Sequence, residues 1–124
     1  IGISSHENDY RLVWAINEHM KLQFTRIENL IIHQVKLQSD LEFGRYLFHD
    51  EDRYFKLYLI SNRCPDGFLF PEVKNIDFLL QVIGDVSKQE LKSLVKGLKA
   101  VPVVSAAFEL PTNKLKGAAN ILVE

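Results

Sequence analysis

The chain has 124 residues, of which 47% are hydrophobic and 25% charged, which is the composition of one ordinary globular domain spanning residues 1–124. Its net charge of -1 excludes a bulk electrostatic attraction to nucleic acid or to an anionic membrane. A single cysteine excludes an internal disulfide framework, and no apolar run reaches the roughly 18 residues needed to cross a bilayer. These features favour a cytoplasmic protein without a membrane partner.

The N-terminal region predicts a strand and then a helix. Residues 1–3 have the pattern of a strand's end, so we expect an upstream part of this strand to be missing. Ser4 and Glu7 have the spacing of a capping box that opens the helix. The buried stripe of the helix is Leu12, Val13, Ala15, Ile16 and Met20. After Met20 the apolar spacing changes to period two and predicts a strand that continues, with a break, to His33. Residues 36–40 are expected to be a polar connection.

The middle of the chain predicts an antiparallel hairpin. Residues 43–48 and 54–61 are aromatic and branched runs separated by five polar residues, and residues 62–67 form a dense turn signature before a short strand at 68–70. Both faces of the second arm carry large side chains. Two helices cannot cover both faces of a sheet of five or six strands, so we predict a homodimer.

The C-terminal third predicts a βαβ unit over residues 76–110. Residues 76–84 alternate as a strand, with Ile76 and Phe78 on the same face. Ser87 and Glu90 form a capping box at the start of a helix that Val101-Pro102 ends, and residues 103–110 form the second strand. The two strands of such a unit are parallel.

The whole pattern is α+β: an open, mostly antiparallel sheet with two main helices on one face, in a ferredoxin-like or related sandwich. A further strand is predicted at residues 121–123, near the end of the C-terminal tail.

The stretch Phe70-Pro71-Glu72-Val73-Lys74-Asn75-Ile76-Asp77-Phe78 places a proline and two acids before an apolar strand. Pro71 cannot donate to a ladder, so it ends one strand before the next begins. Glu72 and Asp77 are five positions apart, which does not pair them as an acid and a base. We expect Asp77 to bind backbone N–H groups or a cation from a neighbouring strand. We therefore assign no catalytic residue.

Other chemistry-bearing residues have simpler structural explanations. The acidic run His49-Asp50-Glu51-Asp52 lacks the alternating donors and the glycine of a calcium loop, so no metal site is predicted. Cys64 has no local nucleophile signature and is interpreted as an incidental turn cysteine. No phosphate loop, nucleophile elbow or zinc spacing occurs, so no cofactor is predicted.

The second predicted helix carries a stripe of basic residues. Its members are Lys88, Lys92, Lys96 and Lys99. Clustered cations of this kind bind phosphates, so nucleic-acid binding is one alternative function. The ordinary interpretation is a solvated outer face, which the neutral chain favours.

The chain resembles the IPExxxVDY family of small, uncharacterised bacterial proteins. The family motif stands here as Phe70-Pro71-Glu72, three residues, then Ile76-Asp77-Phe78. Matching segments also lie at residues 1–5, 9–12, 59–63 and 106–110, so the resemblance covers nearly the whole chain. It implies a bacterial source of the Bacteroidetes type and no known activity. Phe78 replaces the tyrosine of the motif and has no hydroxyl.

The sequence thus favours a non-catalytic binding or interaction domain that forms a homodimer. The alternative is a small-ligand sensor or enzyme whose cleft, around residues 62–77, gathers Arg63, Glu72, Asp77 and a histidine from distant parts of the chain. The ligand of such a cleft is not predicted.

Overall fold

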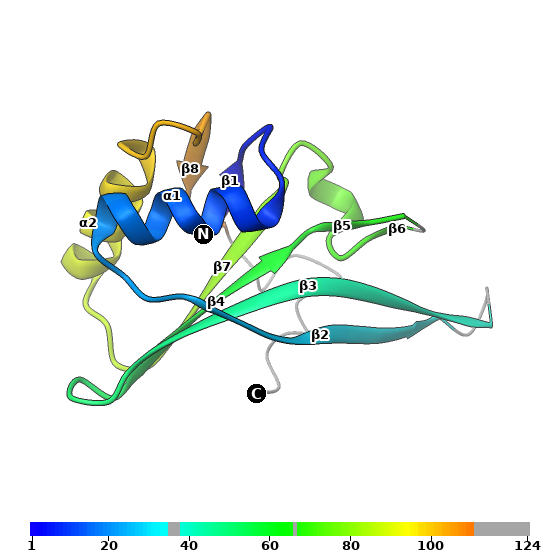
Figure 1. Cartoon of the computed structure of the whole chain (residues 1–124), viewed down its shortest axis with the longest axis horizontal. Coiled ribbons are helices and arrows are strands. Elements are labelled where there is room, and N and C mark those ends of the chain that lie inside the picture. Colours follow the sequence, from blue (N-terminus) through cyan, green and yellow to red (C-terminus); the bar gives the residue numbers. More distant parts are fainter. Residues whose placement is uncertain (35–37, 66, 111–124) are drawn as a thin grey trace.

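The computed structural model describes residues 1–34, 38–65 and 67–110, and shows two helices and a six-stranded antiparallel sheet of order β2-β3-β4-β7-β1-β8 (Figure 1). The α+β class is confirmed. The elements are β1 (Gly2–Ser4), α1 (Asp9–Met20), β2 (Thr25–Gln34), β3 (Ser39–Asp50), β4 (Phe55–Ser61), β5 (Arg63–Cys64), β6 (Gly67–Phe68), the 3-10 turn η1 (Pro71–Val73), β7 (Phe78–Ile83), α2 (Lys88–Lys99) and β8 (Ala106–Phe108). The short strands β5 and β6 pair only with each other among these elements.

The predicted hairpin is confirmed as β3 and β4, which pair in antiparallel register from Arg45↔Ile60 to Asp50↔Phe55. The predicted break in β2 is a register shift between Ile27 and Leu30, where the strand pairs with β3. Part of the expected polar connection is strand instead, since β3 begins at Ser39. The expected strand at 121–123 lies outside the described residues.

The strands of the predicted βαβ unit, β7 and β8, are parallel to each other because both pair antiparallel with β1. The N-terminal strand therefore lies between them. The sequence could not place it there, since the pairing is decided by contacts between residues far apart in the chain.

Each helix begins at a side-chain cap. Ser87 caps α2 as predicted, because its hydroxyl accepts a hydrogen bond from the Glu90 N–H at 3.1 Å. The prediction that Ser4 caps α1 was wrong. The cap is Asn8, whose side chain accepts from the Arg11 N–H at 3.1 Å, whereas Ser4 belongs to β1 and donates its hydroxyl to the Asn75 carbonyl.

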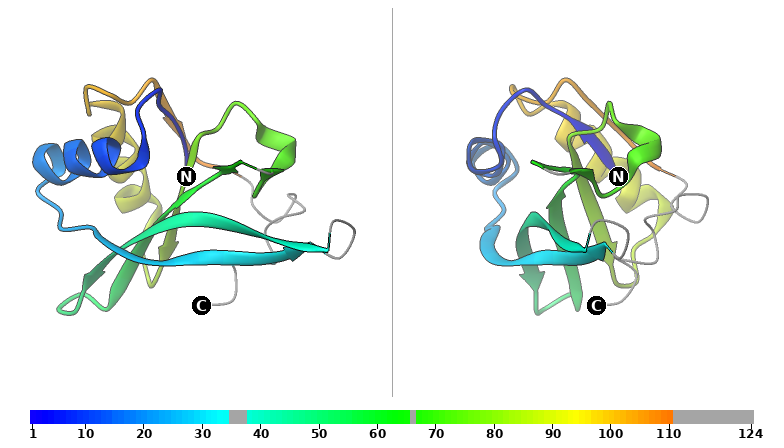
Figure 2. Two further views of the ribbon diagram at one scale, coloured as in Figure 1. Left: turned by 45° about the vertical axis from the view of Figure 1, so that its right-hand side comes forward. Right: turned by 90° about the vertical axis from the view of Figure 1, so that its right-hand side faces the viewer.

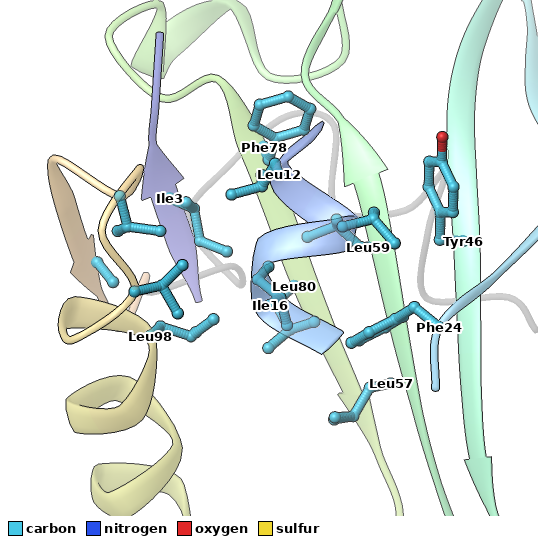
Figure 3. Packing of buried hydrophobic residues seen from close by; sticks show 14 residues of the cluster. Ile3, Leu12, Ile16, Phe24, Tyr46, Leu57, Leu59, Phe78, Leu80 and Leu98 are labelled. Carbon is cyan, nitrogen blue, oxygen red and sulfur yellow. The ribbon is translucent and has the colours of Figure 1, made fainter. Parts of the chain in front are cut away.

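Both helices pack on one face of the sheet. The buried cluster there combines Leu12, Val13 and Ile16 of α1 and Leu98 of α2 with residues of five strands (Figure 3). The strand residues are Ile3, Tyr46, Leu57, Leu59, Phe78, Leu80 and Ala107. Each fully buried Leu, Ile or Phe contributes about 2 kcal/mol of transfer free energy, so this face supplies much of the driving force for folding.

A polar contact fixes the start of α1 against β3. The Tyr46 hydroxyl donates to Asp9 Oδ2 at 3.2 Å. Burial raises the pKa of Tyr46 above its ordinary value, and the nearby Asp9 carboxylate adds to this shift. The neutral phenol is therefore the stable form, and it can donate to the Asp9 carboxylate.

The second face of the sheet is covered by the chain itself. The segment between β4 and β7 places Leu69, Phe70 and Ile76 over Tyr58, Ile60, Leu79, Leu41 and Phe43, and all eight residues are buried. Ile76 therefore does not share the face of Phe78, as the alternation predicted, because it precedes β7. Most of the second face that motivated the homodimer is therefore covered within the described structure, and only its β2 side, with Ile27, Leu30 and Ile32, stays half-buried.

Asn62 holds this covering segment in place through hydrogen bonds. Its side chain is fully buried, donating to the carbonyls of Val73 and Ile76 and accepting from the Phe70 N–H at 2.7 Å. Its main chain donates to the Asp77 carbonyl and accepts from the Leu69 N–H, both at 2.9 Å. A buried amide with all its groups paired fixes one path for residues 69–77.

We predict that Asn62→Ala lowers the free energy of unfolding by about 2–4 kcal/mol, because several buried backbone groups lose their partner. Urea denaturation measures the loss. The control is Asn75→Ala in the same segment, where the hydrogen bond from Ser4 goes to the main-chain carbonyl and is kept. Equal stability of the two variants would show that Asn62 does not organise the segment.

Candidate functional site

The structure brings together two of the three candidate ligand residues, Arg63 and Asp77. Arg63 Nη2 lies 2.6 Å from Asp77 Oδ1 and donates to the Lys74 carbonyl at 3.2 Å. The Asp77 side chain is largely buried, at 19% exposure, and its second oxygen accepts from the Ser5 N–H at 2.8 Å. The expectation that Asp77 binds a backbone N–H and a cation is confirmed.

A polar cavity of about 450 Å³ lies beside this ion pair. It is lined by Ser4, Ser5, His6, Glu7, Ser61, Arg63, Asn75, Asp77, Phe78 and Ser105. The lining comes from β1, the end of β4, the start of β7 and the loop before β8, which are joined because Ser105 N–H donates to the Ser4 carbonyl and Asp77 N–H to that of Ile3. Ser61, Asn75 and Ser105 were not predicted, since these small polar residues carry no motif.

The hydroxyl groups of this cavity stabilise the main chain. Ser5 Oγ donates to the Val103 carbonyl at 2.7 Å and accepts from the Glu7 N–H at 3.2 Å. Ser61 Oγ donates to the Arg63 carbonyl at 2.9 Å. A nucleophilic serine needs a base within hydrogen-bonding reach, and these hydroxyls point at carbonyls instead. Both Asp77 oxygens are also engaged, so the geometry is that of a structural junction.

Glu72 is not part of this cavity. It lies exposed on η1 after Pro71, while Asp77 lies inside the junction. Phe70, immediately before this turn, is fully buried. Glu72 and Asp77 therefore lie in different surroundings, one exposed on the turn and one inside the junction. They do not form the paired acid and base that enzymes of many classes use.

The lysine stripe lies on the exposed side of α2. Lys92, Lys96 and Lys99 line a shallow hollow of about 340 Å³ with Phe108 and Glu109 of the β8 edge. Lys88, also exposed, lies outside this hollow. The acidic Glu109 at its rim reduces the positive potential that a phosphate would need.

A further hollow, of about 580 Å³, lies between α2 and the adjoining ends of β4 and β7. Its lining includes Phe55, Leu57, Val82 and Leu94. Arg53 and Glu90, also in the lining, pair with each other, and Ser87 caps α2. Arg53, Ser87 and Glu90 are thus engaged in contacts within the fold.

Residues 1–34, 38–65 and 67–110 contain neither a cluster of metal ligands nor a helix that could span a membrane. Within these ranges, no three His, Cys, Asp or Glu side chains gather as they would around a metal ion. In the acidic loop, Asp50 Oδ1 accepts from the Arg53 N–H, which is a turn contact. Cys64 is half-buried in β5. Neither α1 nor α2 has the length and apolar character to span a bilayer.

The outer face of α1 carries a feature that the sequence interpretation missed. Trp14 and Tyr10 are 68% and 62% exposed, and they line an apolar groove of about 480 Å³ with Glu7, Arg11, Ala15 and Val103. Their i, i+4 spacing, opposite Leu12 and Ile16, was the available signal. Exposed Trp and Tyr side chains are typical of the centres of protein interfaces.

Comparison with known proteins returns no family model, curated protein or solved structure that matches the chain.

We predict that Asp77→Ala lowers the free energy of unfolding by about 1–3 kcal/mol, because the Ser5 N–H loses its acceptor. Asp77→Asn keeps an acceptor oxygen and loses only a partly exposed ion pair, so the loss stays below about 1 kcal/mol. Chemical denaturation of both variants measures this difference. Unchanged stability of Asp77→Ala would remove the structural role and favour a ligand-binding one.

Proposed function

We propose that this chain is a non-catalytic interaction domain that works as a homodimer. The observation that carries the proposal is the pair of exposed aromatic rings, Trp14 and Tyr10, beside an apolar groove on α1. Large apolar side chains left in water mark surfaces that a partner covers.

The hydrogen bonding of the buried polar groups also supports a non-catalytic role. In the described part of the chain, every buried side-chain nitrogen or oxygen has a hydrogen-bond partner. Asp77, the most enclosed acid of the predicted site, is held by Ser5 and Arg63. Groups that are fully used in the fold are poorly suited to bind and transform a substrate, so association is the better-supported activity.

We also propose, from the sequence resemblance, that the chain belongs to the IPExxxVDY family and acts in the bacterial cytoplasm. The resemblance supplies no activity. Its motif segment has the form of a folding device, since Phe70 and Ile76 are buried against the sheet and Asp77 joins β7 to the N-terminal strand.

A second candidate is a small-ligand sensor, or an enzyme, that uses the polar cavity of about 450 Å³ beside Arg63 and Asp77. The cavity is the observation that favours it. Under this alternative, replacing Asp77 abolishes ligand binding and leaves the melting temperature nearly unchanged. Nucleic-acid binding by the lysine stripe stays a prediction, without a comparable observation in its favour.

The test of association uses the one tryptophan of the chain, Trp14. We expect the sedimentation mass to fall from dimer to monomer on dilution through the micromolar range, with a red shift of the Trp14 emission as the ring enters water. Trp14→Ala, which removes an exposed side chain, is expected to weaken the dimer by about 2 kcal/mol and to leave the melting temperature of the monomer unchanged.

A monomer at every concentration up to the millimolar range would contradict the homodimer. In that case, stabilisation of the chain by a panel of small polar metabolites, lost in Asp77→Ala, would establish the ligand-sensor alternative.

A further inference from the structure

The outward row of α1 and its flanks carries charges that alternate about Trp14. The row consists of Glu7, Arg11, Trp14, Glu18 and Lys21. Arg11, Trp14 and Glu18 are spaced three and four residues apart on one side of α1, opposite the buried Leu12 and Ile16, and Glu7 and Lys21 lie just beyond the two ends of the helix. The signs read negative, positive, aromatic, negative, positive. Read in the opposite direction, every sign is reversed, which is the property of a self-complementary surface.

The geometry of a helix allows the opposite charges of two antiparallel copies of α1 to face each other. Arg11 lies three residues before Trp14 and Glu18 four after it, about 5 and 6 Å along the axis at 1.5 Å per residue. Glu7 and Lys21 lie seven residues before and after Trp14. When two such helices cross antiparallel at Trp14, Arg11 of each comes opposite Glu18 of the other. The flanking charges, Glu7 and Lys21, lie beyond the two ends of α1 and have opposite signs, so they favour the same antiparallel direction.

We propose that α1 is the interface of the homodimer, packed antiparallel against α1 of a second copy about a twofold axis at Trp14. The inference rests on the proposed function and names its partner and surface. In a twofold interface the same patch serves both subunits, so each pairing of Arg11 with Glu18 occurs twice. The alternating charges set the direction and register of the helices, as charged flanks do in coiled coils.

The surface is accessible for this packing. Figure 2 shows α1 end-on at the margin of the molecule in its right-hand view. Arg11 and Glu18 are exposed, and neither is in an ion pair within the described residues. The groove of about 480 Å³ beside Trp14, lined by Tyr10, Ala15 and Val103 among others, is where the Trp14 ring of the second copy is placed.

The same charge pattern argues against other occupants. A uniformly acidic peptide, a nucleic acid or an anionic membrane would meet Glu7 and Glu18 as well as Arg11 and Lys21, and each like-charge contact lowers the affinity. A second copy of this chain, antiparallel, matches all four signs.

The experiment uses two charge reversals, Arg11→Glu and Glu18→Arg, made in separate chains. Either one places like charges opposite each other twice in a homodimer, so we expect at least a tenfold rise in the dimer Kd by sedimentation. Mixing the two variants in equal amounts restores both pairings, and the heterodimer is expected to form within about threefold of the wild-type Kd. The double variant R11E/E18R is expected to dimerise like the wild type.

Neither charge reversal is expected to unfold the chain, so a weaker dimer can be attributed to the interface. An acid in the first turn and a base in the last turn favour the helix, so both reversals suit α1. Circular dichroism and the melting temperature check this directly. Lys92→Glu, the same size of charge change on the outer face of α2, is the matched control and is expected to leave the Kd unchanged.

Three results would overturn the inference. A wild-type dimer whose Kd is unchanged by either reversal would place the interface elsewhere and leave the proposed function standing. Variants that dissociate and are not rescued by mixing would exclude the antiparallel pairing. A wild-type monomer at all concentrations would remove the inference together with the homodimer.

Discussion

The buried amide of Asn62 is the constraint on which the rest of this structure depends. Its side chain and main chain together bind Leu69, Phe70, Val73, Ile76 and Asp77, so every polar group of the residue is used. With these bonds made, the segment between β4 and β7 has one path and lies over the sheet. Without them, several main-chain groups in an apolar site would lack partners, and burying them would be unfavourable.

The position of this covering segment also bears on where the chain can associate with a partner. Because Leu69, Phe70 and Ile76 cover the middle of the second face of the sheet, most of that apolar surface is buried within the chain. The large aromatic rings left exposed on α1, Tyr10 and Trp14, point to association on the helical side instead. The ion pair of Arg63 with Asp77 belongs to the same junction, since Asp77 also holds the Ser5 N–H. Asp77, which the sequence offered as a possible ligand residue, thus serves to hold the N-terminal segment against the start of β7.

Much of this fold is encoded locally and could be predicted from the sequence. The β3–β4 hairpin follows from two apolar runs around a polar loop, and the start of α2 follows from Ser87 and Glu90. The role of Asp77 was predictable because a carboxylate beside a strand start seeks N–H groups and cations.

The remaining features depend on contacts between distant residues. Ser4 and Asn8 both satisfy the rules for a helix cap, and only the hydrogen bond of Ser4 to the Asn75 carbonyl decides between them. Asn62 looks like a turn residue in its sequence context, since burial of an asparagine has no local signal. The exposure of Trp14 was predictable from its spacing opposite Leu12, but its charged neighbours become meaningful only when a second copy is considered.

The central claim is that the junction covers its own face and that α1 meets a second copy. Amide and indole NMR spectra, recorded across a dilution series, test it most directly. The account predicts that the single indole N–H signal of Trp14 and the amides of α1 shift with concentration, while the Asn62 side-chain amide and the Phe70 amide stay fixed. Shifts confined to Asn62, Leu69 and Phe70, with Trp14 unchanged, would contradict it.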